Sequence, residues 1–183
     1  MDLLRESAIE FAKLFKRYFT YTLDDGSSFN LFFAPHHFHH LLGLQKLADK
    51  PEIQVNLPKG NSAAYIFKKI LTGKITLEDI KTSKYFNEIE LRLRHFKQIN
   101  RIAETTEIIF EFDPTLINSK GLQTGRILFK MSNDNLYLNL IIKIDAVQND
   151  FYIPYTFIPR HSDDYTHRQK SIKISSRTVI KRT

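Results

Sequence analysis

The chain has 183 residues, no cysteine and a formal net charge of +7. Its length and its 42% of hydrophobic residues fit one packed domain over residues 1–183. The lack of cysteine excludes disulfides, thiolate metal sites and thiol catalysis, and it fits a reducing cytoplasm. Because charged residues interrupt the N-terminal segment and no run of about 18 apolar residues occurs, we expect neither an export signal nor a membrane span.

Helices are expected in the first half of the chain. The chain opens with an apolar stripe at helical spacing, which consists of Leu4, Ala8, Phe11, Phe15 and Phe19. This spacing predicts an amphipathic helix up to Phe19. Capping residues and apolar periodicity predict further helices over residues 36–48, 62–73 and 83–96, and a capping box predicts a short helix after Thr76.

Strands are expected mainly in the second half. One short strand or hairpin arm is predicted early, over residues 27–33. From Thr105 onward, segments rich in Ile, Phe, Tyr and Leu alternate with turn signals, and they predict strands over residues 107–112, 126–131, 136–144, 151–158 and 171–180. Pro154 cannot donate to a strand ladder, so its strand is expected to be an edge or to carry a bulge.

The order of these elements predicts the fold class. Helices followed by strands are typical of an α+β protein. We therefore expect N-terminal helices packed on a C-terminal antiparallel sheet of about four to five strands. The helical half would cover residues 1–104 and the sheet half residues 105–183, within one domain.

The positive charge is concentrated at the C-terminal end. Residues 160–183 contain seven Lys and Arg but only two Asp, so +5 of the net charge of +7 lies there. A concentrated positive field attracts a polyanion, and binding through phosphates would weaken as salt is added. The alternative is a solvated tail that only improves solubility.

Four of the seven histidines lie within five positions, at His36, His37, His39 and His40. Histidine is the side chain best suited to transfer protons near pH 7. At the start of the predicted helix, the helix dipole would lower the histidine pKa and favour the neutral form that can act as a base.

Three interpretations of this cluster stay open. His36 and His40 are spaced i, i+4 and could ligate a metal, but the His-Glu-x-x-His pattern and a cysteine are both missing. Single rings of the cluster could instead be half-buried and structural. In the third interpretation, a neutral imidazole removes the proton from a ribose 2′-hydroxyl without a metal. Gly43 costs roughly 1 kcal/mol inside a helix, so close approach of a backbone or a ligand would explain it.

The segment from Phe38 to Leu44 carries the pattern aromatic-x-His-Leu-x-Gly-Leu. It resembles a phage-borne group of the Barnase, EndoU, colicin and RelE-like nuclease superfamily. Residue by residue, His40 matches the motif histidine and Gly43 the motif glycine. The resemblance implies RNA cleavage without metal or other cofactor, through a 2′,3′-cyclic phosphate. Because neighbouring residues lie about 100° apart around a helix, His39 is the alternative base if the phase of the helix differs.

Cleavage also needs positive charge at the phosphate and an acid for the departing 5′-oxygen. Arg160, at the end of a predicted strand, is the candidate for the phosphate, because a guanidinium can donate two parallel hydrogen bonds to its oxygens. The candidate acids are His161, Tyr165 and His167, and Tyr165 could also stack on a base. Four further residues of the basic tail are candidates for RNA binding: Arg168, Lys170, Lys173 and Arg177.

The leading hypothesis is therefore a metal-independent RNA endonuclease with His40 as general base and Arg160 at the phosphate. RNA is the expected partner, with no membrane involvement, and an inhibitor or a host protein is a further candidate partner. The alternative is a phage protein on a nuclease-like fold that binds RNA or a host protein without cleaving. This alternative predicts salt-sensitive binding without cleavage products.

Overall fold

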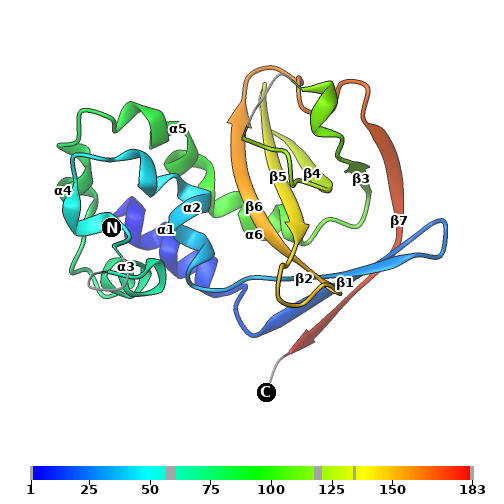
Figure 1. Ribbon diagram of the computed structural model, residues 1–183, viewed down its shortest axis with the longest axis horizontal. Coiled ribbons are helices and arrows are strands. Elements are labelled where there is room, and N and C mark those ends of the chain that lie inside the picture. Colours follow the sequence, from blue (N-terminus) through cyan, green and yellow to red (C-terminus); the bar gives the residue numbers. More distant parts are fainter. Residues whose placement is uncertain (1, 57–60, 118–120, 134, 182–183) are drawn as a thin grey trace. The chain divides into compact units, whose positions relative to one another are not determined.

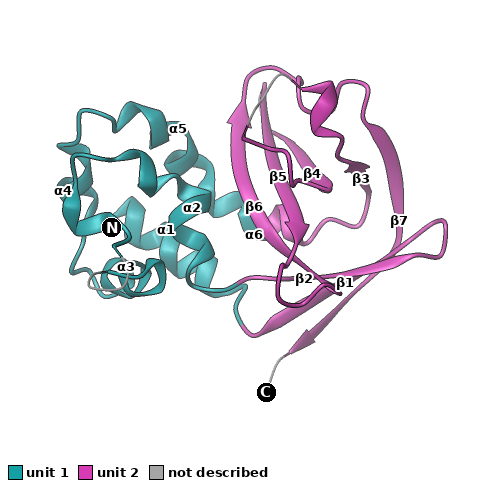
Figure 2. Cartoon of the chain, in the orientation of Figure 1, with its two compact units in different colours: residues 1–15, 34–100 teal, residues 16–33, 101–183 magenta. Residues whose placement is uncertain are grey.

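The computed structural model describes residues 2–56, 61–117, 121–133 and 135–181. The chain divides into two compact units, shown in different colours in Figure 2. Unit 1 consists of Met1–Phe15 and Ala34–Asn100, and unit 2 consists of Lys16–Phe33 and Arg101–Thr183. The chain therefore leaves unit 1 early, contributes one hairpin to unit 2, and returns. That both units form one domain stays a prediction.

Unit 1 is helical. Its α-helices are α1 (Leu3–Ala12), α2 (His37–Leu42), α3 (Ala63–Leu71), α4 (Leu77–Lys81) and α5 (Asn87–His95), with short 3₁₀ turns at Leu44–Lys46, Pro51–Ile53 and Phe96–Gln98. Helix α6 (Ile99–Ala103) leads from unit 1 into unit 2. Ser62 caps α3, and Thr76 forms a capping box with Asp79 at the start of α4, so both predicted helix starts are confirmed.

Aromatic rings form the centre of unit 1. The Phe38 ring lies 5.6 Å from Phe11, 5.1 Å from Phe67 and 5.2 Å from Phe96, measured between ring centroids. Tilted and edge-on pairs at these distances are favourable beyond the area they bury.

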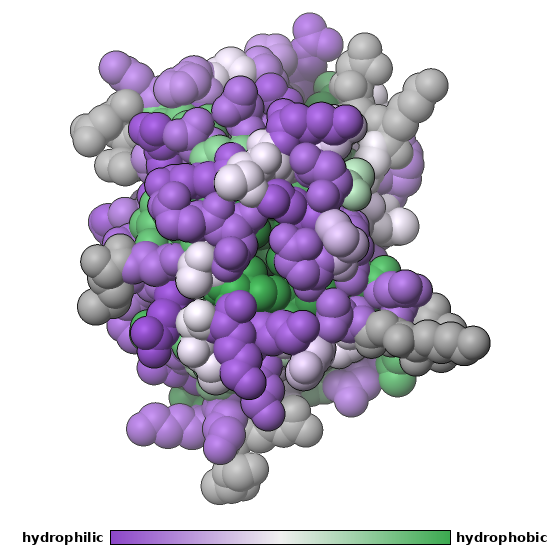
Figure 3. Space-filling view, turned by 90° about the vertical axis from the view of Figure 1, so that its left-hand side faces the viewer, coloured by the Kyte–Doolittle hydropathy of each residue, from purple (hydrophilic) through white to green (hydrophobic). Residues whose placement is uncertain are grey.

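On the face of the molecule shown in Figure 3, hydrophilic residues dominate, and a small hydrophobic area lies near the centre.

Unit 2 is a closed barrel whose strand order is β1-β2-β6-β5-β4-β3-β7 (Figure 1). The strands are β1 (Arg17–Leu23), β2 (Ser28–Phe32), β3 (Ile108–Glu111), β4 (Ile127–Asn133), β5 (Leu136–Ile144), β6 (Phe151–Arg160) and β7 (Lys170–Lys181). Neighbouring strands are antiparallel except β2 and β6, which pair in parallel over two residues.

The predicted α+β fold, with N-terminal helices packed on a C-terminal antiparallel sheet of about four to five strands, is therefore wrong. The five strands predicted after Thr105 are all present, but β1 and β2 join them and close the sheet into a barrel. Closure removes the edges that an open sheet would expose. Helices α1 to α5 belong to a separate compact unit.

The first helix was predicted too long, because its apolar stripe fits two periods. Phe15 and Phe19 continue the helical spacing, but Phe19, Tyr21 and Leu23 also alternate with less buried residues, as in a strand. Helix α1 ends at Ala12, and Lys16 adopts a positive φ of 57° directly before β1. In this aromatic and Thr-rich segment, the alternation of buried and less buried residues thus predicts the observed strand, and the helical spacing does not.

Pro154 lies at a bulge, as predicted. Ile141 pairs with Thr156, while Ile142 pairs with Pro154, so Tyr155 is the extra residue on β6. The barrel interior is aromatic: the Tyr21 ring lies 4.8 Å from Phe29 and 5.2 Å from Phe129 between centroids. Because side chains alternate along a strand, the neighbours of Phe129 on β4 point to the outer face.

Candidate functional site

Helix α2 carries the histidine cluster of unit 1. His36 precedes the helix and is exposed, whereas His37 and His39 are buried and His40 is exposed. The helix spans only six residues, so His39 and His40, its third and fourth residues, lie near both of its ends. An influence of the helix N-terminus on these two rings stays a prediction.

The two candidate bases have different surroundings. The Nε2 atom of His39 lies 2.7 Å from the carbonyl oxygen of Ile53, inside the unit. Burial lowers the pKa of His39, and the bond to Ile53 raises it less. The His40 ring is at the surface, where its Nδ1 lies 3.2 Å from Nε2 of Gln45. Of the two, His40 is the ring that is exposed to solvent.

The buried His39 ring predicts a loss of stability in acid. In the unfolded chain a histidine has a pKa of about 6.5. Since its pKa in the folded protein is lower, the unfolded state binds the proton first as the pH falls below about 6.5, and the free energy of unfolding decreases. Urea unfolding at pH 7.5 and pH 5.0 should show a smaller pH dependence for His39→Gln than for the wild type. An equal dependence in both proteins would show that His39 does not contribute.

Gly43 has a structural explanation. It ends α2 in the left-handed region, with φ +88°, so the predicted helix over residues 36–48 is interrupted there. A Cβ at this position would lie 3.1 Å from Cγ2 of Ile89, which is closer than normal contact. The motif glycine is thus required both for the backbone turn and for the packing of α5 against it.

Replacing Gly43 by alanine should therefore destabilise unit 1 by about 2 kcal/mol, because the left-handed backbone alone costs about 1–2 kcal/mol for a residue with a Cβ. Gly73→Ala is the matched control: Gly73 has φ +74°, but a Cβ there meets nothing within 4 Å. Urea denaturation should show a clearly smaller loss for Gly73→Ala. Equal losses would mean that contact with Ile89 contributes nothing.

In unit 2, positive and aromatic side chains gather on the outer face of β4, β5 and β6. Lys130 on β4 is the second residue after the outward-facing Leu128, and Tyr137 on β5 pairs in register with Arg160 on β6. The loop after β6 lies against the same face. We call this surface the basic-aromatic face, and it consists of Lys130, Tyr137, Arg160, His161, Asp163, Tyr165, Thr166 and His167.

Lys130 is held by several contacts at once. Its Nζ lies 2.7 Å from Oδ2 of Asp163 and 3.2 Å from Oγ1 of Thr166. The same ammonium lies 5.6 Å from the centroid of the Phe110 ring and 5.2 Å from that of Tyr137. Burial raises the pKa of Asp163, but the hydrogen bonds from Lys130 and Thr166 and the charge of Lys130 outweigh it, so the pKa is lowered.

Arg160 converges on the same loop. Its guanidinium carbon lies 5.8 Å from the centroid of the Tyr165 ring, one residue before the threonine that contacts Lys130. Tyr165 is only 6% exposed and packs in an outer cluster with Phe112 and Ile141. The tyrosine can therefore position Arg160, but a buried ring offers little surface for stacking on a base.

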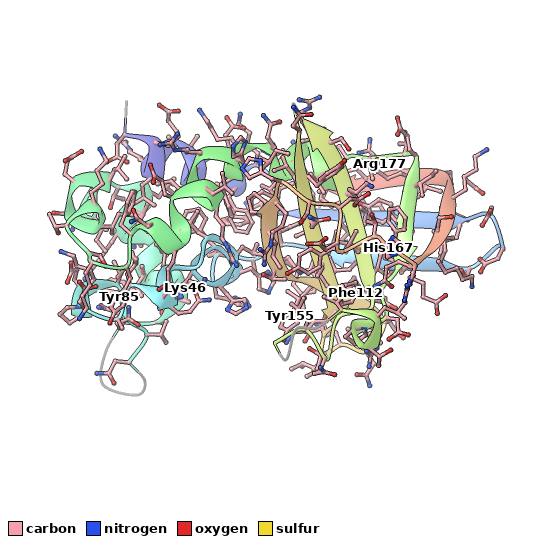
Figure 4. All side chains as sticks on the ribbon, turned by 90° about the horizontal axis from the view of Figure 1, so that it is seen from above. Lys46, Tyr85, Phe112, Tyr155, His167 and Arg177 are labelled. Atoms are coloured by element: carbon pink, nitrogen blue, oxygen red, sulfur yellow. The ribbon has the colours of Figure 1, made fainter. Side chains whose placement is uncertain are left out.

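The two histidines of this face are exposed. His161 follows Arg160 directly, and His167 lies on the loop between β6 and β7 (Figure 4). The positive charge that His167 can carry helps to lower the pKa of Asp163, which places these two residues near each other. The structure thus brings Arg160, Tyr165 and His167 together at one surface, and His161 is associated with it only as the exposed residue that follows Arg160.

The basic tail is less uniform than expected. Lys170 pairs with Glu111 at 3.1 Å, and Lys173 is exposed. Arg168 has a positive φ of 65° and lines a pocket of about 470 Å³ together with Lys170 and Arg126. A non-glycine residue in this strained region is a reason to look for a role.

Arg177 does not belong to the solvated part of the tail. It pairs in register with Tyr21, whose ring is inside the barrel, and Nε and Nη1 of Arg177 are fully buried with no hydrogen-bond partner among the described residues. Burial raises the pKa of Tyr21, and the charge of Arg177 opposes this effect in part. Arg177 is therefore turned toward the interior, whereas the other three predicted RNA-binding residues, Arg168, Lys170 and Lys173, are exposed.

Lys130, Tyr137 and Asp163 were not predicted as site residues. On β4, Lys130 alternates with buried Phe129, so its position resembled any polar residue on the outer side of a strand. The signal that could have found it is the combination of a lysine within an apolar strand and an acid in the loop after Arg160. Only the strand register brings these residues together.

Among the described residues, no three His, Cys, Asp or Glu side chains are grouped so that they could hold a metal ion. No described helix is both long and apolar enough to cross a membrane.

Comparison with known proteins assigns the chain to the nuclease-like proteins associated with phages. Residues 3–183 match the model of the family described as phage-Barnase-EndoU-ColicinE5/D-RelE like nuclease 4, and the chain belongs to this family. The resemblance inferred from the histidine motif is thereby confirmed. Searches of curated proteins and of solved structures gave no match.

Proposed function

We propose that this protein is a metal-independent RNA endonuclease whose basic-aromatic face binds the RNA backbone. The observation that carries the proposal is the convergence of two cations on one loop: Lys130 contacts Asp163 and Thr166, and Arg160 lies over Tyr165. Two cations fixed by a preorganised loop can stabilise the extra negative charge that develops on a phosphate during cleavage.

The reaction transfers two protons. The 2′-hydroxyl loses its proton as its oxygen forms a bond to phosphorus, the bond between phosphorus and the 5′-oxygen breaks, and the 5′-oxygen takes up a proton. The products are a 2′,3′-cyclic phosphate and a 5′-hydroxyl. On the basic-aromatic face, His161 and His167 are the exposed groups that can transfer protons near pH 7.

The remaining residues of the face have supporting roles in this proposal. Asp163 accepts from Lys130 and holds the ammonium over Phe110 and Tyr137, so the cation is in place before RNA arrives. Tyr165 does the same for Arg160 through its ring. Arg168 and Lys170 extend the positive surface along the start of β7 and can bind further phosphates. In unit 1, the family motif implies that His40 acts as general base, and the His40→Ala variant tests this role by itself.

The test is incubation of the purified protein with end-labelled RNA in EDTA, with DNA of the same sequence as control. We expect RNA fragments that end in a 2′,3′-cyclic phosphate, and intact DNA. Cleavage that disappears in EDTA would contradict the metal-independent mechanism. RNA binding that weakens with salt but yields no fragments would instead support the non-enzymatic alternative.

A further inference from the structure

A second hollow of unit 2 borders the basic-aromatic face. It is a pocket of about 610 Å³ at the outer side of β3 and β4, and its lining includes Arg101, Glu107, Ile108, Phe110, Lys130 and Ser132. Lys130 belongs to both places, since its ammonium contacts the loop after β6 while the residue also lines the pocket. A ligand bound at Lys130 therefore has this pocket directly beside it.

Part of the pocket lining is apolar although it is open to solvent. Ile108 is 50% exposed, one of the largest exposed fractions among the apolar side chains of unit 2, and Phe110 and Met131 are partly buried beside it. Exposed apolar surface inside a hollow is costly in water and marks a binding site. A flat aromatic group of a ligand would cover this surface by stacking on Phe110.

The rim of the pocket supplies opposite charges. Glu107 is exposed, and among the described residues its carboxylate makes no ion pair and no hydrogen bond. Arg101 contributes a guanidinium from α6. The pocket thus offers an acceptor with two oxygens and a donor group beside the apolar side chains of Ile108 and Phe110.

Among the four RNA bases, this combination fits guanine best. Guanine presents two adjacent donors, N1–H and the 2-amino group, and next to them the O6 acceptor. A carboxylate can accept from both donors, while a guanidinium can donate to O6. Uracil and cytosine each offer one donor group at the corresponding edge, and adenine offers only its 6-amino group, so none of these three bases presents two adjacent donor groups to one carboxylate.

We infer that this pocket binds a guanine base next to the scissile phosphate, with Glu107 as the residue that determines specificity. The inference rests on the proposed function for its substrate class, since the phosphate bound at Lys130 would connect the base to the cleavage site. Phe110, whose ring lies 5.6 Å from the Lys130 ammonium, forms the boundary between the base and the phosphate.

The experiment compares cleavage of RNAs that differ only in the nucleotide beside one bond. The wild type should cleave the guanosine RNA with a kcat/KM about 10- to 100-fold above the other three, because a two-bond contact to a base contributes that much discrimination. Glu107→Gln should lose this preference, so that its kcat/KM for the guanosine RNA falls to the level of its kcat/KM for the adenosine RNA. Replacing guanosine by inosine, which lacks the 2-amino group, should reproduce much of the loss with the wild type.

The control variant is Glu104→Gln, which removes an exposed carboxylate that pairs with Arg17 and does not line the pocket. It should keep the guanosine preference. A wild type without base preference, or a Glu107→Gln variant that keeps it, would overturn the inference. If no RNA is cleaved, the affinities of the protein for guanosine 5′-monophosphate and adenosine 5′-monophosphate, measured by NMR, test the inference separately from the nuclease proposal. Tighter binding of the guanosine nucleotide would support a guanine site in this pocket. Equal affinities, or no binding, would overturn it.

Discussion

The Arg160→Ala variant should lose RNA cleavage, with kcat/KM lower by about 10²–10³-fold, the usual effect of removing one group that stabilises transition-state charge. Arg160 is exposed at the end of β6, and its contact with Tyr165 is worth only about 0.5–1 kcal/mol at such a site, so the fold should persist. Initial rates on a short labelled RNA, with circular dichroism of the same sample, measure both quantities.

Lys143→Ala is the matched control for Arg160→Ala. Lys143 also lies on the outer face of the barrel and covers an aromatic ring, with its Nζ 4.7 Å from the centroid of Tyr155, but it is not part of the basic-aromatic face. The control removes one positive charge and one ring contact, and it should reduce the rate only slightly through weaker attraction of RNA. Comparable losses in both variants would show that Arg160 acts only through general charge.

The His40→Ala variant tests the family motif. If the motif histidine is the general base, cleavage should decrease by about 10²–10⁴-fold, the range that general acid-base groups contribute. Because His40 is at the surface and its ring contacts Gln45, the substitution should not unfold unit 1. In single-turnover rates measured from pH 5 to pH 8, the increase with pH that deprotonation of the general base causes should also disappear.

His36→Ala is the control for this variant, since His36 is an exposed histidine next to the same helix and has no counterpart in the motif. It should keep full activity. Undiminished cleavage by His40→Ala would remove His40 from the mechanism and leave His161 and His167 as the proton-transfer groups.

The sequence predicted the local elements of unit 2 better than their assembly. Alternation and turn signals located six of its strands, including β2 (Ser28–Phe32) within the predicted segment 27–33, and β5 was predicted with its observed bounds, Leu136–Ile144. The barrel was missed because β1 lies where an apolar stripe also fits a helix, and because closure depends on the pairing of β1 with β7, more than 150 positions apart in the chain. Local patterns carry no information about such distant pairing.

The candidate site was predicted in part, for a similar reason. Arg160, His161 and His167 follow one another closely in the sequence, so one charged and turn-rich segment indicated all three. Lys130 comes from another strand and is identified only by its contacts with Asp163 and Thr166. The burial of Tyr165 and Arg177 also depends on tertiary packing, which the composition of the basic tail does not reveal.

The attack of a ribose hydroxyl on the neighbouring phosphate is tested most directly with an RNA that carries one 2′-deoxynucleotide immediately 5′ of a mapped cleavage bond. We predict that, in EDTA, cleavage stops at this bond and continues at unmodified bonds of the same molecule. Cleavage of the modified bond at an unchanged rate would contradict the proposed mechanism.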